Sequence, residues 1–388
     1  MRILFVQYAG DYLEAYRRLQ STGKETYYGH RYVLDQLERL QTFGEVAMMC
    51  CLSPVRYEER LPNGITVIGA RAHPKKNPVK ISQMMNAWNP THVVVLGPLP
   101  IQIRWATSRK RRVMCMMADS FNTHSFLQAV KNRRLVRLLN SDRVGHLGNH
   151  GINACHSLAR IGVNPDKIVA WDYPHTRRPS DLQPRKLNSS GVRKLLYVGA
   201  IQAHKGVGDS IDSVAELKRR GMAVRLQLAG DGDIKRFRKQ ALKSGVSEDV
   251  EFLGLVPNSD VFERMREVDV VVIPSHHQYP EGLPLTIYEA LCARTPIVAS
   301  DHPMFRGHLV DRRTAMVFPA RQPIAMADSI EKLVNDHDLY ATLSTNSASA
   351  WEGMQIPTKW GDVLYHWLRD TEVDREWLIN ARPQALND

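Results

Sequence analysis

Glu281 and Glu289 are the two residues of the chain whose surroundings point most clearly to chemistry. They lie on either side of an expected helix start, which follows the apolar strand candidate Val268–Ile273 and a histidine-containing loop. We expect the helix to begin near Gly282–Pro284, because proline suits the first helical turn. Free amide groups at a helix start attract phosphate, so this turn predicts a site for a phosphorylated ligand.

The expected roles of the two glutamates follow from charge, because a carboxylate that faced the phosphate directly would repel it. We expect Glu281 to bind sugar hydroxyls and Glu289 to bind ribose hydroxyls, on the two sides of a diphosphate. Gly282 would let the backbone approach the phosphate closely. The alternative is that both glutamates are ordinary solvated or capping residues. The strand, loop and helix around them favour the ligand site.

A second strand-to-helix turn carries a lysine. The strand candidate Lys194–Gly199 is followed by Lys205, which directly precedes Gly206. A cation at such a turn could bind the phosphate of the same ligand, whereas a lone lysine in a loop is otherwise simply solvated. Lysine is a suitable point charge for this purpose. The turn Leu228–Asp233, which includes Gly230, predicts either a further ligand loop or a simple turn.

The candidate residues of the N-terminal half are less specific. Asp119 follows the strand candidate Val113–Ala118 and could accept the proton of an acceptor hydroxyl or stabilise a positively charged transition state. It could equally cap the next helix, which is expected to end near Leu139. Tyr12 and Tyr16 belong to a long connection and predict either a lid that stacks on a sugar or the core face of a helix.

Short apolar strand candidates alternate with amphipathic helices along the whole chain, which predicts parallel sheets covered on both faces. Periodicity is absent between Asp172 and Arg193, where Pro, Ser and Arg are frequent. We therefore expect an N-terminal domain (1–172), a linker (173–192), a C-terminal domain (193–356) and a helical tail (357–388). The expected class is α/β, with two doubly wound Rossmann-like domains that face a cleft.

Three segments carry a resemblance to a known family: Tyr197–Gly206, Leu228–Gly232 and Pro274–Ser300. The last includes Glu281-Gly-Leu-Pro-Leu and Glu289-Ala-Leu. Together they resemble glycosyltransferase family 4, closely over about residues 194–335 and loosely in the N-terminal half. The resemblance implies a GT-B fold with the C-terminal helix packing back toward the N-terminal domain. It also implies a nucleotide-sugar donor, retention of anomeric configuration and no essential metal, with acceptor binding by the first domain and donor binding by the second.

The resemblance implies roles for individual residues. Lys205 would contact the diphosphate, Glu281 the donor sugar and Glu289 the ribose, and the other donor-binding positions would be Gly199, Gly230, Gly282, Leu283 and Pro284. Many family members have an arginine where this chain has Ala200, so one expected phosphate cation is absent or supplied elsewhere. The expected catalytic residues are Glu281, Lys205 and Asp119. The expected acceptor-binding residues are Tyr28, Gly29, His30 and His124.

Composition limits the remaining function classes. The formal net charge is +12, and residues 1–190 hold 28 Lys and Arg against 13 Asp and Glu, with a maximum in Arg104–Arg143. This predicts either a solvated surface or a face for anionic lipid or an anionic acceptor. No nucleic-acid-binding module accompanies the charge. The five cysteines have no CxxC spacing, so we expect neither disulfides nor a metal site. We expect no cofactor, because the nucleotide-sugar donor would be a substrate.

The sequence therefore predicts a retaining, metal-independent glycosyltransferase that moves a sugar from a nucleotide-sugar to an acceptor hydroxyl. Synthesis of a cell-surface glycan or of a glycosylated natural product would fit. No apolar run is long enough to span a bilayer, so the expected location is cytoplasmic, with peripheral contact at the inner membrane face. The second interpretation is a non-catalytic nucleotide-binding or partner subunit with the same fold.

Overall fold

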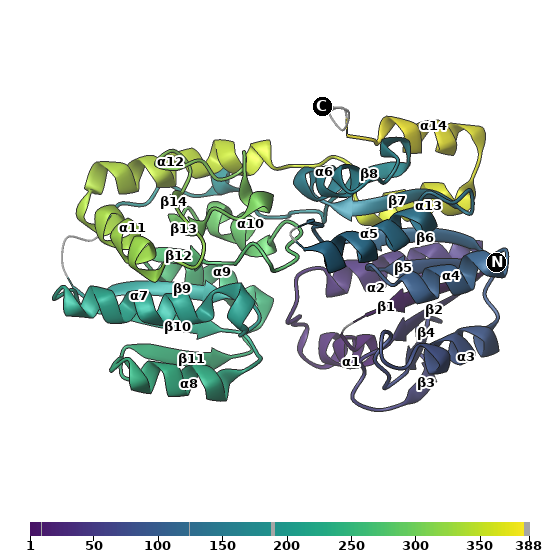
Figure 1. Cartoon of the computed structure of the whole chain (residues 1–388), viewed down its shortest axis with the longest axis horizontal. Coiled ribbons are helices and arrows are strands. Elements are labelled where there is room, and N and C mark those ends of the chain that lie inside the picture. Colours follow the sequence, from purple (N-terminus) through teal and green to yellow (C-terminus); the bar gives the residue numbers. More distant parts are fainter. Residues whose placement is uncertain (9, 124, 188–190, 384–388) are drawn as a thin grey trace. The chain divides into compact units, whose positions relative to one another are not determined.

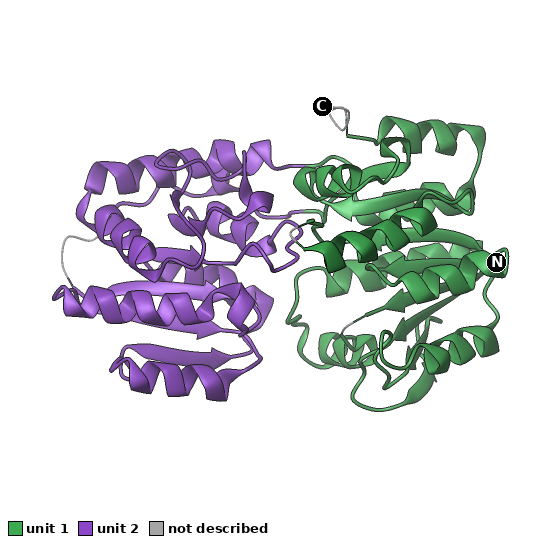
Figure 2. Cartoon of the chain, viewed as in Figure 1, with its two compact units in different colours: residues 1–174, 356–388 green, residues 175–355 purple. Residues whose placement is uncertain are grey.

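The protein consists of two compact units, residues 1–174 with 356–388 and residues 175–355 (Figure 2). The computed structural model describes the chain except for residues 9, 124, 188–190 and 384–388. The expected linker 173–192 spans the boundary between Pro174 and His175. Each unit is built around its own sheet and its own cluster of buried apolar side chains.

The sheet of the first unit has the strand order β3-β4-β2-β1-β5-β6-β7-β8 among the described residues. Every neighbouring pair is parallel except β3 and β4 (Figure 1). The central strands are almost wholly buried, as the apolar runs predict. The strands are β1 (Arg2–Gln7), β2 (Glu45–Cys50), β3 (Tyr57–Arg60), β4 (Thr66–Gly69), β5 (His92–Leu96), β6 (Arg112–Met117), β7 (Val144–His150) and β8 (Ile168–Trp171).

The helices of this unit follow the strands in turn. They are α1 (Tyr12–Thr22), α2 (His30–Leu40), α3 (Pro78–Trp88), α4 (Pro100–Ser108), α5 (Phe126–Leu139), α6 (Ile152–Arg160), α13 (Trp360–Arg369) and α14 (Glu372–Asn380). The structure decides between the two interpretations for Tyr12. The Tyr12 side chain is buried, on the face of helix α1 that packs inward. The lid interpretation is therefore wrong for Tyr12.

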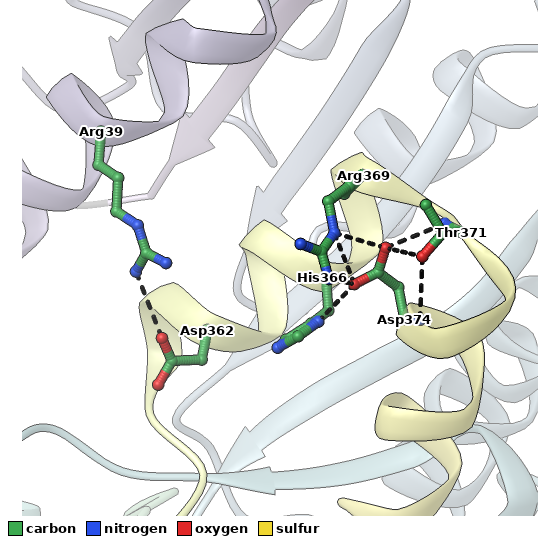
Figure 3. A network of polar contacts seen from close by, with 6 residues as sticks. All are labelled: Arg39, Asp362, His366, Arg369, Thr371 and Asp374. Atoms are coloured by element: carbon green, nitrogen blue, oxygen red, sulfur yellow. Dashed lines mark hydrogen bonds and ion pairs between the residues drawn. The ribbon is translucent and has the colours of Figure 1, made fainter.

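The tail of the chain returns to the first unit, as expected for the fold. Trp360 at the start of α13 packs against Phe5 of β1, with ring centroids 6.0 Å apart. Asp362 of α13 contacts Arg39 of α2 at 3.3 Å (Figure 3). The two tail helices are joined through the fully buried Asp374, which accepts hydrogen bonds from Arg369, His366 and Thr371.

The sheet of the second unit has the order β11-β10-β9-β12-β13-β14 and is parallel throughout. Its strands are β9 (Arg193–Val198), β10 (Val224–Ala229), β11 (Val250–Gly254), β12 (Val270–Ile273), β13 (Ile297–Ser300) and β14 (Met316–Phe318). Its helices are α7 (Val207–Arg219), α8 (Ile234–Lys243), α9 (Asn258–Glu267), α10 (Leu285–Cys292), α11 (Pro323–Asn335) and α12 (His337–Gly353). The expected doubly wound α/β class is thus confirmed for both units.

Candidate functional site

The order of strands places a switch point in the middle of the second sheet. Strand β9 pairs with β12, and Leu195 and Leu196 lie in register with Val270 and Val271. From β9 the chain runs outward through β10 and β11, whereas from β12 it runs the other way through β13 and β14. Open α/β sheets bind ligands at such a point, beyond the carboxyl ends of the strands. The loops that leave β9 and β12 carry Lys205 and Glu281.

These two side chains are in direct contact. Lys205 Nζ lies 2.6 Å from Glu281 Oε1, and the same oxygen accepts a hydrogen bond of 2.6 Å from Ser275 Oγ. The Glu281 side chain is 6% exposed and that of Lys205 is 16% exposed. The pair is therefore held in a mostly desolvated place where charges interact more strongly than in water. The structure thus brings together Lys205 and Glu281, which the sequence predicts to act on the same ligand.

Gly206 explains how the two loops come so close. It has a left-handed backbone (φ 75°) between the short 3-10 turn Ala203–Lys205 and helix α7. A Cβ atom at this position would lie 2.0 Å from the carbonyl oxygen of Pro274, which begins the loop after β12. Only glycine permits both the backbone conformation and the approach, so Gly206 sets Lys205 beside Glu281.

An aromatic ring and a histidine support the lysine. Lys205 Nζ lies 4.4 Å from the centroid of the Tyr279 ring. The buried His302 accepts at Nδ1 from the amide of Met304 at 3.2 Å, so its Nε2 donates to the carbonyl of Tyr279 at 3.1 Å. Burial lowers the pKa of His302, which keeps the ring neutral at neutral pH. The loop that carries Tyr279 is thus fixed by a neutral imidazole.

Helix α10 begins at Leu285, one residue later than expected, with Pro284 as its N-cap. Proline therefore precedes the first turn instead of opening it. Thr286 Oγ1 donates to the carbonyl of Val198 at the end of β9, which fixes the helix start against the switch point. The first amides of a helix lack intrahelical acceptors, so this end can receive a phosphate.

The other expected donor-site residues lie around this helix start. Gly282, Leu283 and Pro284 join Glu281 to α10, and the side chain of Leu283 is buried. Glu289 lies within α10, where its Oε1 accepts from Asn258 Nδ2 at 2.5 Å. Glu289 is thus tied to the first residue of α9, which follows β11.

Two glycines of the second unit line neighbouring loops. Gly199 directly follows β9, and Gly230 directly follows β10. The amide of Gly199 donates to the carbonyl of Ala229, and a Cβ atom on Gly230 would lie 1.8 Å from the carbonyl oxygen of Gly199. The structure therefore brings these two residues together, and close packing of the loops requires glycine at 230.

Asp119 lies at the carboxyl end of β6 in the first unit. The Asp119 amide donates to Asn149 Oδ1 at 3.3 Å, and Asn149 Nδ2 donates to the Asp119 carbonyl at 2.9 Å. Burial raises the pKa of the Asp119 carboxyl to about 6. The capping interpretation is wrong, because Ser125 is the N-cap of α5 and accepts from the amide of Gln128. A carboxyl with a raised pKa at a strand end remains a candidate for proton transfer.

The expected acceptor-site residues gather at the start of α2. Tyr28 donates to the carbonyl of Pro174, and Gly29 is the N-cap of the helix. The ring of His30 packs against those of Tyr12 and Tyr27. Burial, and then Arg18, lower the pKa of His30 to about 4. His124 lies outside the described residues.

Sequence reasoning missed the immediate partners of the two central side chains. Ser275 and Tyr279 stand in the loop that was singled out, but nothing in the spacing shows which of its residues turn toward Glu281 and Lys205. Asn258 is 31 residues from Glu289 in the sequence, and only the order of the strands brings the two together. The one available signal was that Ser275 and Asn258 lie within a few residues after the ends of β12 and β11.

Two negative findings concern the described residues alone. Within that part of the chain, no helix is both long and apolar enough to cross a membrane. In the same part, no three His, Cys, Asp or Glu side chains gather in an arrangement that could hold a metal ion.

Comparison with known proteins finds similarity in the second half of the chain. Residues 180–350 match the family model of glycosyl transferases group 1. The chain is 32% identical over 155 residues to alpha-D-kanosaminyltransferase of Streptomyces kanamyceticus, a match that covers 40% of this chain and 39% of that protein. The chain thus spans about two fifths of the length of this curated relative.

Solved structures with the same fold cover nearly the whole chain. Sucrose-phosphate synthase from Thermosynechococcus elongatus aligns with a TM-score of 0.69 at 15% identity, over 95% of this chain and 98% of that one. HepE of Anabaena in complex with UDP-glucose aligns with a TM-score of 0.65 at 14% identity, over 91% and 95%. The chain therefore has two Rossmann-like units of the GT-B type, and its residues 180–350 are similar to the glycosyl transferases group 1 family.

Proposed function

We propose that the protein transfers a sugar from a nucleoside diphosphate sugar to an acceptor hydroxyl, with retention of anomeric configuration and without a metal ion. The observation that carries the proposal is the contact between Lys205 and Glu281 at the switch point, beside the start of α10. The match of residues 180–350 to a glycosyltransferase family supports it. HepE, whose fold is similar, was solved with UDP-glucose bound.

The donor would be held entirely by the second unit. Its diphosphate would accept hydrogen bonds from the first amides of α10 and an ionic bond from Lys205. Glu281 would accept hydrogen bonds from sugar hydroxyls, and Glu289 from ribose hydroxyls. Lys205 already contacts Glu281, so in the complex it would bridge the carboxylate and the terminal phosphate, where negative charge develops as the sugar leaves.

In the reaction, the bond between the anomeric carbon and the phosphate oxygen breaks as the acceptor oxygen bonds to the same carbon. The acceptor proton passes to the departing phosphate on the same face of the sugar, or to Asp119. Asp119 suits the second route because its pKa, raised to about 6, is nearer to neutral pH than that of an ordinary aspartate. Tyr28, Gly29 and His30 would contribute to the acceptor side.

The acceptor would be a hydroxyl of a cell-surface glycan precursor or of a natural product. The excess of Lys and Arg in residues 1–190 would suit an anionic acceptor or contact with the inner face of a membrane. The protein would then act in the cytoplasm.

A screen of UDP, GDP, ADP and dTDP sugars tests the proposal. Release of nucleoside diphosphate is measured with and without candidate acceptors, for the wild type and for Lys205→Ala and Glu281→Ala. We expect turnover with one donor class and a loss of about a hundredfold or more in each variant. Binding of a donor without any turnover, or full turnover in both variants, would refute the proposal.

A further inference from the structure

A pocket in the first unit is lined by residues at the amino ends of β6 and β7 and in or next to helices α13 and α14. Its volume is about 290 Å³. This is close to the lower end of the usual range for small-molecule sites, about 300–1,000 Å³. The residues that line it include five with cationic side chains: Lys110, Arg111, Arg112, Arg143 and Arg375.

The charges of this pocket do not balance. Five cationic side chains face only two acidic ones, Asp142 and Asp370. Asp370 is already shared, with Arg112 and Arg375 each 3.0 Å from one of its oxygens. Within the described part of the chain, neither Lys110 nor Arg143 has an ion-pair partner. The pocket thus has an excess of positive charge that an anion would offset.

Two polar atoms of residues in the lining lack the hydrogen bonds that buried groups normally make. Arg111 Nε and His146 Nδ1 are buried and have no partner among the described residues. The guanidinium of Arg111 is held in place at its other end, where a terminal nitrogen donates to Asn89 Oδ1 at 2.7 Å. The guanidinium is thus fixed in the pocket lining, where its charge adds to the positive excess.

The state of His146 fits the same ligand class. Burial, then Arg382 and Lys167, lower its pKa to about 4, so the ring is neutral at neutral pH. A neutral imidazole has one N–H, which can donate to an anion. The buried side chains of Trp367 and Leu378 also line the pocket and supply an apolar surface.

We propose that this pocket binds a phosphomonoester. Guanidinium groups match the geometry of phosphate oxygens, and a dianion neutralises more of the excess positive charge than a single carboxylate does. The volume exceeds what a bare phosphate needs, and the apolar wall of Trp367 and Leu378 suits a small organic group attached to it.

The pocket is separate from the proposed transfer site. Strand β6 runs from Arg112, in the pocket lining, to Met117, which lies two residues before Asp119. Six residues of a strand span roughly 20 Å, so the pocket and Asp119 lie at opposite ends of β6. The basic segment Arg109–Arg112, which the transfer reaction does not use, thereby gains a role.

The test uses the NMR signal of His146 as a reporter of binding in the pocket. Imidazole signals of the full-length protein are followed by NMR while inorganic phosphate or glycerol 3-phosphate is added at constant ionic strength, with chloride as the reference anion. The His146 signal is assigned from its absence in His146→Gln. Phosphate bound at the donor site does not interfere, because the readout is local to the pocket.

Two double variants are matched in charge and exposure. Lys110→Gln with Arg143→Gln removes two exposed cations from the pocket, and Lys131→Gln with Arg134→Gln removes two exposed cations of α5 that do not line it. We expect saturable movement of the His146 signal, and a dissociation constant about tenfold larger in the pocket variant only. A signal that phosphate moves no more than chloride does, or equal weakening in both variants, would overturn the proposal.

The phosphate group could belong to a soluble metabolite or to a lipid. Sedimentation with phosphatidylcholine vesicles that contain phosphatidic acid distinguishes the two sources. If the wild type and the α5 variant bind these vesicles and the pocket variant does not, the ligand is a lipid headgroup. If the vesicles do not bind but glycerol 3-phosphate moves the His146 signal, the ligand is soluble. Failure of both arms overturns the site.

Discussion

Replacing Asp119 by asparagine should stabilise the first unit at neutral pH. Burial raises the pKa of this carboxyl from 3.8 to about 6, so the folded protein holds its proton more tightly than the unfolded chain does. The stabilisation by the proton is fully present below the unfolded pKa and is lost as the pH rises through about 6. Above that pH the folded protein carries an ionised carboxylate at a cost in stability, and asparagine avoids this cost.

The size of the effect follows from the shift. A change from 3.8 to about 6 corresponds to roughly 3 kcal/mol, since one pKa unit is about 1.4 kcal/mol. Asp119 is partly exposed, and water reduces the figure, so we expect a gain of about 1–2 kcal/mol near pH 7.5. The gain should fall through the window between about pH 6 and pH 4 and vanish below it.

Urea unfolding measures this gain. Hydrogen exchange in peptides from β6 and β7 is used as the probe, so that the unfolding of the first unit alone is monitored. Asp166→Asn is the matched control, because its side chain is 76% exposed, and it should show no gain. The proposed proton acceptance adds a kinetic signature. Turnover of the wild type should fall below about pH 6, and that fall should be absent from the residual turnover of the variant. A gain that is independent of pH, or a loss of stability near pH 7.5, would refute the reasoning.

Two further variants test the architecture of the units. Gly206→Ala forces a Cβ against the Pro274 carbonyl at a left-handed backbone position, so amides of β12 and α10 should exchange with an opening free energy lower by roughly 2–4 kcal/mol. Unchanged exchange there would contradict the packing. Asp374→Asn should lower the melting temperature at neutral pH, because Arg369 holds the pKa of Asp374 below 3.8. The difference from the wild type should shrink as the pH falls below 3.8, and a constant difference would count against it.

Much of the fold was predictable because buried parallel strands are continuous apolar runs. The strand expected at Val113–Ala118 is β6, Arg112–Met117, and the strand expected at Lys194–Gly199 is β9, Arg193–Val198, so each is shifted by one residue. The two missed strands have different causes. In β3, Tyr57–Arg60 is charged and pairs in antiparallel fashion at the sheet edge. Strand β8, Ile168–Trp171, is buried throughout but only four residues long, which is too short for periodicity to show.

The candidate site was predictable at the level of strand ends and not at the level of side-chain partners. Lys205 and Glu281 are 76 residues apart, and their shared site followed from two similar strand-to-helix turns. Their direct contact, with Ser275 as a third member, depends on the approach of Gly206 to Pro274, which no local pattern encodes. Likewise, α5 is capped by Ser125 and not by Asp119, because the segment between Asp119 and the helix is longer than a capping turn.

The most direct test of the account is the affinity for the free nucleoside diphosphate of the preferred donor, measured by calorimetry without turnover. Lys205→Met removes the cation but keeps the length of the side chain, and Lys243→Met removes an exposed cation from the last turn of α8. The account predicts binding about 10- to 100-fold weaker in Lys205→Met and unchanged in Lys243→Met. Equal affinity in the wild type and Lys205→Met would contradict the claim that the diphosphate lies between Lys205 and the start of α10.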